Sequence, residues 1–238
     1  MLDLQLKNKL PIPGKTNLDW YLFHNVISEY KGKPMLEVGV GRGGSALTMA
    51  YMTPILDVID SWDQTWKKES VEKILPAKFI DAKSSQAEID KDYAFIHLDA
   101  NKSLEGTYDD LIKYSTHCTG VICVDDYLQS MWPEVTRAVD VFVDKTNWKR
   151  ILIGNHQVFL SRKRTSAVKQ IAIEFPVTMV NEEIFFTYGK LPTDELFQKF
   201  MSVNNIRLYT WHKKAYHETT ICKSEGLETT AVGERSTH

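Results

Sequence analysis

Short apolar runs and amphipathic segments alternate along the chain up to about residue 145. Apolar runs bounded by turn-forming residues predict five strands, at 35–38, 55–59, 78–81, 93–98 and 120–124. The segments between and around them predict helices at 16–30, 44–52, 67–73, 105–114 and 133–143. Because strands and helices alternate at this spacing, we expect an α/β fold: a Rossmann-like, doubly wound and mostly parallel sheet with helices on both faces.

The pattern changes in the next part of the chain. Two strand-like runs, 150–154 and 157–160, are separated only by Asn155 and His156. A parallel partner strand needs a crossover connection of about a dozen residues, so two strands this close together must pair antiparallel. The sequence therefore predicts that the parallel sheet ends in an antiparallel hairpin.

The chain divides into three predicted parts. We expect residues 1–163 to form the α/β domain and residues 164–222 to form an extension that covers an acceptor site or joins two subunits. The extension contains a strand-like run at 171–175, a capped helix at 193–203 and an apolar run at 206–211, and its aromatic residues favour a homodimer. The polar residues 223–238 predict a disordered tail.

Composition narrows the classes of function. The formal net charge of -2 gives no electrostatic reason to expect a nucleic acid or an anionic membrane as partner. The three cysteines do not have metal-ligand or redox spacing, which favours a reducing compartment. No apolar run is long enough to predict a signal peptide or a membrane span. We therefore expect a cytoplasmic protein that acts on a small molecule.

A glycine-rich turn follows the first predicted strand and fits two patterns of cofactor binding. Gly39-x-Gly41-x-x-Gly44 fits the dinucleotide fingerprint of hydride-transfer enzymes. Glu37-x-Gly39-x-Gly41-x-Gly43 fits the turn by which many methyltransferases hold S-adenosylmethionine. Glycines suit either ligand, because they let the backbone approach it and turn amide groups towards it. The turn alone leaves both cofactors open.

Acidic residues follow the second, fourth and fifth predicted strands. Asp60 is placed to accept hydrogen bonds from the ribose hydroxyls of either cofactor. Asp99 ends the fourth strand, and Asp125 with Asp126 ends the fifth. If these strands are neighbours, about 4.8 Å apart, the three carboxylates converge, and a hard divalent cation such as Mg²⁺ would relieve their repulsion. The alternative is that these acids only cap the helices that follow.

Two segments together resemble a known family. HLDANKSLEGTYDDL (97–111) and GVICVDDYLQSMWPEVTRAVDVFV (120–143) resemble the class I, metal-dependent O-methyltransferases, above all the macrocin-type sugar O-methyltransferases and their relatives. The resemblance covers about residues 30–163, including the terminal hairpin typical of that fold.

The resemblance implies a set of site residues. It implies Asp99, Asp125 and Asp126 as metal ligands, Glu37, Gly39, Gly41, Gly43 and Asp60 as cofactor-binding residues, and Ser84 or Ser85 near the adenine. The chain departs from the family pattern at two places. It has Asn101 where the family has an aspartate, and His-Cys-Thr-Gly at 117–120 where the family has Pro-Gly-Gly before the strand. The first departure is expected to alter contacts with the acceptor.

A lysine is the candidate general base. The spacing Asp99-x-x-Lys102 resembles catechol O-methyltransferase, in which a lysine three residues after the first metal aspartate takes the proton. A cation beside a lysine lowers its pKa towards neutrality, which suits that role. The alternative is a solvated loop lysine.

The sequence thus predicts an S-adenosylmethionine-dependent O-methyltransferase. In this hypothesis a divalent cation, Mg²⁺ above all, binds and activates a hydroxyl of a sugar or another small natural-product or polysaccharide acceptor. Two alternatives stay open: an NAD-dependent oxidoreductase that uses the same glycine turn, and a catalytically inactive methyltransferase-like binding module.

Overall fold

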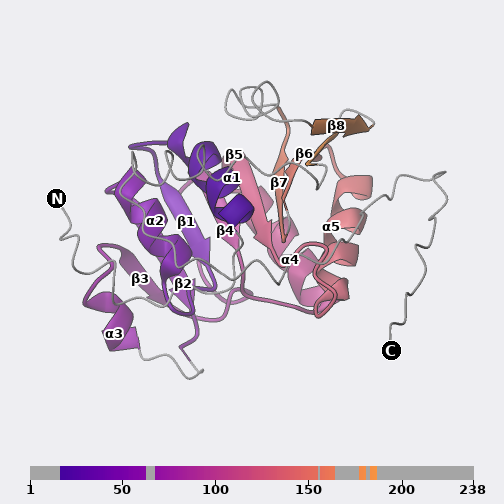
Figure 1. Ribbon diagram of the computed structural model, residues 1–238. Helices are drawn as coiled ribbons and strands as arrows, with labels where there is room; N and C mark the ends of the chain where they lie inside the picture. Colours follow the sequence, from indigo (N-terminus) through magenta and orange to yellow (C-terminus); the bar gives the residue numbers. More distant parts are fainter. Residues whose placement is uncertain (1–16, 63–67, 155, 164–176, 181–182, 187–238) are drawn as a thin grey trace, which may run out of the picture.

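A single mixed β-sheet organises the computed structural model, which describes residues 17–62, 68–154, 156–163, 177–180 and 183–186 (Figure 1). Its strands are β1 (Met35–Val38), β2 (Leu56–Asp60), β3 (Lys78–Asp81), β4 (Tyr93–Leu98), β5 (Cys118–Asp125), β6 (Lys149–Ile153), β7 (Gln157–Ser161), β8 (Val177–Val180) and β9 (Glu183–Phe186). The helices are α1 (Asn17–Ser28), α2 (Gly44–Met52), α3 (Lys68–Glu72), α4 (Leu104–Ser115) and α5 (Pro133–Lys145). The elements up to β7 follow the predicted order, with boundaries that differ by a few residues.

The first five strands are parallel and lie in the order β3-β2-β1-β4-β5. The chain moves outward from β1 to β3 and then returns to form β4 on the other side of β1. The sheet therefore has a switch point between β1 and β4, and in open α/β sheets ligands bind at the carboxyl ends of the strands beside such a point. The predicted doubly wound, mostly parallel sheet is confirmed.

Strand β7 lies between β5 and β6 and is antiparallel to both. At the turn between β6 and β7, the backbone N–H of Gly154 donates to the carbonyl of Gln157 at 2.7 Å. The predicted antiparallel hairpin is confirmed, since so short a connection leaves the chain no room for a crossover.

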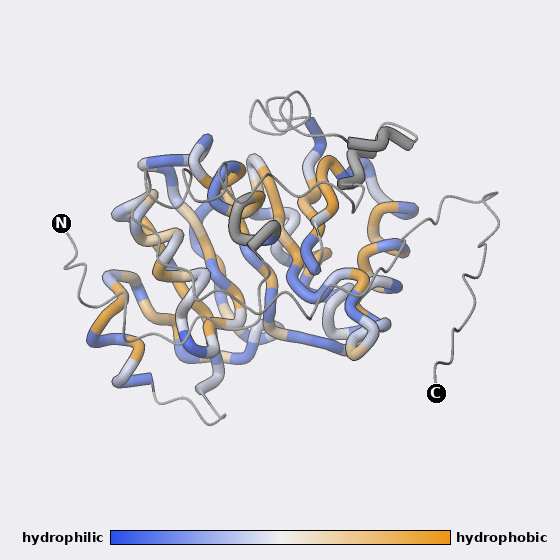
Figure 2. Tube along the Cα trace, viewed as in Figure 1, coloured by the Kyte–Doolittle hydropathy of each residue, from blue (hydrophilic) through white to orange (hydrophobic). Residues whose placement is uncertain are grey.

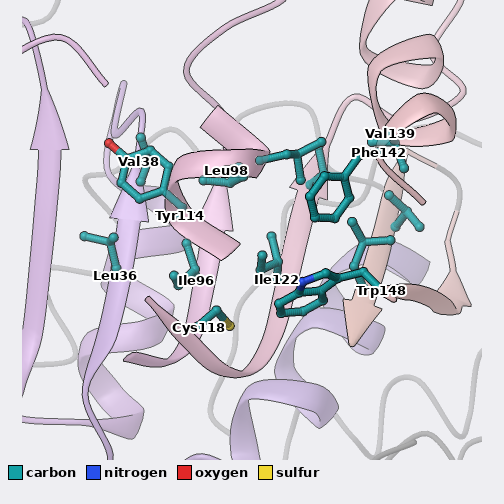
Figure 3. Close-up of a cluster of buried hydrophobic side chains, with 14 of the residues drawn as sticks. Leu36, Val38, Ile96, Leu98, Tyr114, Cys118, Ile122, Val139, Phe142 and Trp148 are labelled. Atoms are coloured by element: carbon teal, nitrogen blue, oxygen red, sulfur yellow. The ribbon is translucent and has the colours of Figure 1, made fainter. Parts of the chain in front are cut away.

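Two hydrophobic cores cover the two faces of the sheet, because consecutive strand residues point to opposite sides. Met35 and Phe95 belong to the core shared with α1, α2 and α3, and their neighbours Leu36 and Ile96 belong to the core shared with α4 and α5. Figure 3 shows part of the second core, including Phe142 of α5. Figure 2 shows the same organisation along the chain, with apolar residues in the strands and alternating apolar and polar residues along α5. The sheet is therefore a rigid, dry platform for the loops at its ends.

A second hairpin, β8–β9, extends the sheet beyond β6 and was not predicted from the sequence. Strand β9 pairs parallel with β6 through Phe185 and Ile153. The predicted strand at 171–175, helix at 193–203, apolar run at 206–211 and tail at 223–238 lie outside the described residues. The domain boundary at residue 163 and the role of 164–222 stay predictions. Within the described part of the chain, none of the helices has the length and apolar character that a bilayer crossing requires.

Candidate active site

A pocket of about 370 Å³ opens at the carboxyl ends of β1, β2 and β4, beside the switch point. Its lining residues come from four loops: Gly39, Gly41, Ile59, Asp60, Ser61, Trp62, Ala82, Lys83, Ser84, Ser85, Asp99, Ala100 and Asn101. Predicted cofactor residues from three separate parts of the sequence thus border one cavity.

The glycine turn has positive φ angles at three positions, a conformation that favours glycine. Gly39, Gly41 and Gly43 have φ of 86°, 51° and 80°. A Cβ on Gly39 would lie 2.6 Å from the backbone nitrogen of Ala100 in the loop after β4. The turn after β1 and the loop after β4 are therefore in direct backbone contact at the floor of the pocket.

Asp60 holds the glycine turn in place. One carboxylate oxygen accepts hydrogen bonds from the backbone N–H groups of Val40 at 2.7 Å and Gly41 at 3.1 Å. The other accepts from the N–H of Trp62 at 3.0 Å. A carboxylate has about four acceptor positions, so these three bonds leave Asp60 able to accept one from a ligand. The structure thus places Asp60 in the pocket wall and adds a supporting role that the sequence did not reveal.

Glu37 lies inside the protein and is not among the residues that line the pocket. The hydroxyl of Ser45, in α2, donates a hydrogen bond to Oε1 of Glu37. Oε2 lies 3.2 Å from Nδ1 of His97, on the neighbouring strand β4, and the side chains of Glu37 and His97 are fully buried. Glu37 therefore links β1, β4 and α2 beneath the turn, and its role as a cofactor-binding residue stays a prediction.

Helix α4 braces the loop that contains Ser84 and Ser85. The ammonium of Lys113 donates to the carbonyls of Ser84 at 2.8 Å, Ser85 at 3.1 Å and Ala87 at 2.6 Å. The hydroxyl of Tyr114 also donates to the Ser84 carbonyl, at 2.7 Å. Burial lowers the pKa of Lys113 despite the nearby carboxylate of Asp110. The predicted adenine-side loop is thus fixed through its backbone by two side chains that the sequence analysis did not single out.

Asn101 connects this loop to Asp110 of α4. Its amide nitrogen donates to Ser84 Oγ and to Asp110 Oδ2, both at 2.8 Å. Burial raises the pKa of Asp110, although the hydrogen bonds from Asn101 and Ser84 oppose the rise. An aspartate at position 101, as in the resembled family, would place a second carboxylate against Asp110, so the asparagine fits this chain's own network.

Lys102 lies between two of the three predicted metal ligands. Its Nζ is 2.5 Å from Oδ1 of Asp99 and 2.5 Å from Oδ2 of Asp126. Their strands are neighbours, with Leu98 paired to Val124, so the two acids converge as predicted. Burial favours a lower pKa for Lys102, but the two carboxylates outweigh it and raise the pKa above its ordinary value. In this arrangement the ammonium of Lys102 is a donor to both carboxylates, and its role as general base stays a prediction.

The predicted divalent-cation site does not fit the residues as they are arranged. Asp125 is buried at the end of β5, and among the described residues no three or more histidine, cysteine, aspartate or glutamate side chains form a group that could hold a metal ion. An ammonium has three donors and no acceptor, so Lys102 cannot ligate a cation and would have to leave before one bound Asp99 and Asp126 together.

Comparisons with known proteins find the fold and little sequence similarity. No protein-family model matches the sequence, and no curated protein matches it. Among solved structures, CalS11, a TDP-rhamnose 3'-O-methyltransferase of calicheamicin biosynthesis, matches 68% of this chain and 93% of its own, with 13% identity and a TM-score of 0.51. The chain has a methyltransferase fold.

Two further structures match less closely. The O-methyltransferase NovP has 18% identity and a TM-score of 0.43, over 68% of this chain and 79% of its own. The N-methyltransferase NodS from Bradyrhizobium japonicum has 11% identity and a TM-score of 0.44, over 59% of this chain and 90% of its own. At these identities the likeness concerns the fold alone.

Proposed function

We propose that this protein transfers a methyl group from S-adenosylmethionine to a hydroxyl of a small acceptor, with a sugar as the favoured class. One observation carries the proposal: the cavity formed by the glycine turn and Asp60 adjoins Asp99, the first member of the Asp99–Lys102–Asp126 cluster. A cofactor pocket and a charged, partly exposed cluster thus meet at the switch point of a methyltransferase fold.

The pocket offers one type of contact for each part of the cofactor. The turn at Gly39–Gly41 lets the backbone approach the ligand, Asp60 accepts from a ribose hydroxyl, and the Ser84–Ser85 loop borders the adenine side. The antiparallel β7 and the likeness to CalS11 support S-adenosylmethionine over NAD. The sugar acceptor rests on the sequence resemblance and on what CalS11 is named for.

The proposed reaction needs a positioned hydroxyl. The acceptor oxygen forms a bond to the methyl carbon while the carbon–sulfur bond breaks, and the electron pair of that bond returns to sulfur to give S-adenosylhomocysteine. The hydroxyl proton passes to a carboxylate, and Asp99 is the acid of the cluster that also borders the cofactor pocket. No step is assigned to the predicted Mg²⁺, since the described residues do not fit it; its use stays a prediction.

A binding experiment tests the cofactor. Isothermal titration calorimetry should show binding of S-adenosylmethionine and S-adenosylhomocysteine and none of NAD. Gly39→Ala should weaken S-adenosylhomocysteine binding by at least about tenfold, because its Cβ would lie 2.6 Å from the Ala100 backbone and displace the turn.

Gly32→Ala is the matched control, since Gly32 also has a positive φ, of 76°, but meets no atom within 4 Å of an added Cβ. Its S-adenosylhomocysteine affinity should equal that of the wild type. Binding of NAD without binding of S-adenosylmethionine would refute the proposal.

A further inference from the structure

The Asp99–Lys102–Asp126 cluster already contains a cation of its own. One ammonium lies 2.5 Å from a carboxylate oxygen on each side, and the two acids come from adjacent strand ends. The three side chains are 18–32% exposed, and Asp99 also lines the pocket. Two carboxylates and one ammonium leave one net negative charge, which favours an uncharged or cationic acceptor over an anionic one.

The residues on both sides of Lys102 are held by hydrogen bonds of their side chains. Asn101 is held by its bonds to Ser84 and Asp110. Ser103 caps α4 through a hydrogen bond from the N–H of Gly106 to its Oγ, at 3.1 Å. The main chain at Lys102 is therefore held in a defined position from which the ammonium reaches the two acids. This is expected of a preorganised site and differs from a lysine on a free surface loop.

We infer that Lys102 takes the position of a divalent cation, and that its remaining N–H donates to the acceptor oxygen. Two of its three donors serve Asp99 and Asp126, which leaves one for a substrate. The bound hydroxyl is then oriented by a charged donor, and the chain binds no divalent ion at this cluster. This inference rests on the proposed methyl transfer for its catalytic meaning, but its binding consequence can be measured by itself.

The test measures Mn²⁺ binding by electron paramagnetic resonance, with Mg²⁺ calorimetry as a second probe. The wild type should leave Mn²⁺ free, whereas Lys102→Met should bind it at least about tenfold more tightly, because two adjacent carboxylates lose the cation between them. Lys102→Gln, which keeps a donor without the charge, should behave like Lys102→Met and serves if the methionine variant does not fold.

Lys68→Met is the matched control. Lys68 Nζ also lies near two acids, 3.7 Å from Glu72 and 3.4 Å from Asp81, but these acids are 42% and 58% exposed. Its removal should create no Mn²⁺ binding, because exposed carboxylates stay hydrated and separate.

Two results would overturn the inference. Wild-type protein that binds Mn²⁺ as tightly as the Lys102 variants would show that the ammonium does not exclude the ion. Folded Lys102 variants that bind no Mn²⁺ would show that the acids do not form a cation position. S-adenosylhomocysteine affinity in the same samples reports on the proposed function separately, since it depends on the neighbouring cofactor pocket.

Discussion

Two carboxylate–lysine clusters lie at opposite ends of the parallel strands and differ in composition and exposure. At the amino end, Asp57 accepts from the hydroxyl of Tyr93 at 2.7 Å and lies 2.9 Å from the ammonium of Lys91. At the carboxyl end, Lys102 serves two acids. The side chain of Asp57 is 3% exposed, whereas those of Asp99 and Asp126 are 32% and 18% exposed.

The difference in exposure indicates that the cluster at the amino end supports the fold, whereas the cluster at the carboxyl end can contact a ligand. Asp57 contacts one ammonium and accepts from one hydroxyl, so its charge is balanced. Its side chain is also buried, so a ligand cannot reach it. Burial and the hydrogen bond to Asp57 raise the pKa of Tyr93 above its usual range, so it is a neutral donor. The carboxyl-end cluster has more acid than base and is accessible, which is the arrangement expected where a ligand completes the contacts.

Removing Asp57 should have the largest effect on folding. Asp57→Ala leaves the fully buried Tyr93 hydroxyl without its acceptor, and should lower the free energy of unfolding by about 3 kcal/mol in urea titrations. S-adenosylhomocysteine affinity of the folded variant should be unchanged. A stability loss below that of Asp126→Asn would contradict the contrast between the clusters.

Removing the brace on the Ser84–Ser85 loop should have an intermediate effect, seen in binding. Lys113→Met removes three hydrogen bonds to that loop and should weaken S-adenosylhomocysteine binding about fivefold, measured by calorimetry. Lys78→Met is the control, because the side chain of Lys78 makes an exposed ion pair with Asp90, at 3.6 Å, and does not border the Ser84–Ser85 loop or the pocket. Equal affinities in the two variants would exclude a positioning role for Lys113.

Asp126→Asn should change stability little. Asp126 has a φ of 61°, a conformation that asparagine tolerates well, and Lys102 keeps its contact with Asp99. We expect a change within about 0.5 kcal/mol in urea titrations, since partly exposed ion pairs contribute little. A loss as large as that of Asp57→Ala would place this cluster among the supports of the fold.

Asp110 gives the smallest predicted effect, in the pH dependence of stability. Burial raises its pKa in the folded state above the ordinary value of 3.8, so the folded protein binds more protons than the unfolded chain between the two values. This group therefore makes stability fall as pH rises through that window. Urea midpoints should fall less steeply with pH in Asp110→Asn than in the wild type, and an unchanged slope would contradict the burial argument.

The glycine turn and the position of Asp60, which border the pocket, could be predicted from the sequence because their requirements are local. A turn with positive φ at three positions demands glycines, and a strand ending in Asp60 fixes where the carboxylate lies. The first hairpin was predictable for a similar reason, since two intervening residues permit only antiparallel pairing. The runs 177–180 and 183–186 are also two residues apart, and the same rule would have indicated β8–β9.

The contacts around Lys102 and Glu37 were less predictable because they depend on which side chains meet in space. The sequence brought Asp99 and Asp126 together correctly but left the role of Lys102 between base and solvated lysine. Position within the buried strand places Glu37 against His97 and Ser45, where spacing alone suggested a direct ligand contact. These side-chain contacts depend on tertiary packing, which a local sequence pattern does not predict.

The backbone contact between Gly39 and the peptide joining Asp99 to Ala100 has an evolutionary consequence. Side-chain substitution cannot adjust the spacing of two segments that touch through their main chains, so the turn after β1 and the loop after β4 must shift as one unit. For the proposed methyltransferase, a change of acceptor would therefore come through the outer loops, and residue 39 would stay glycine.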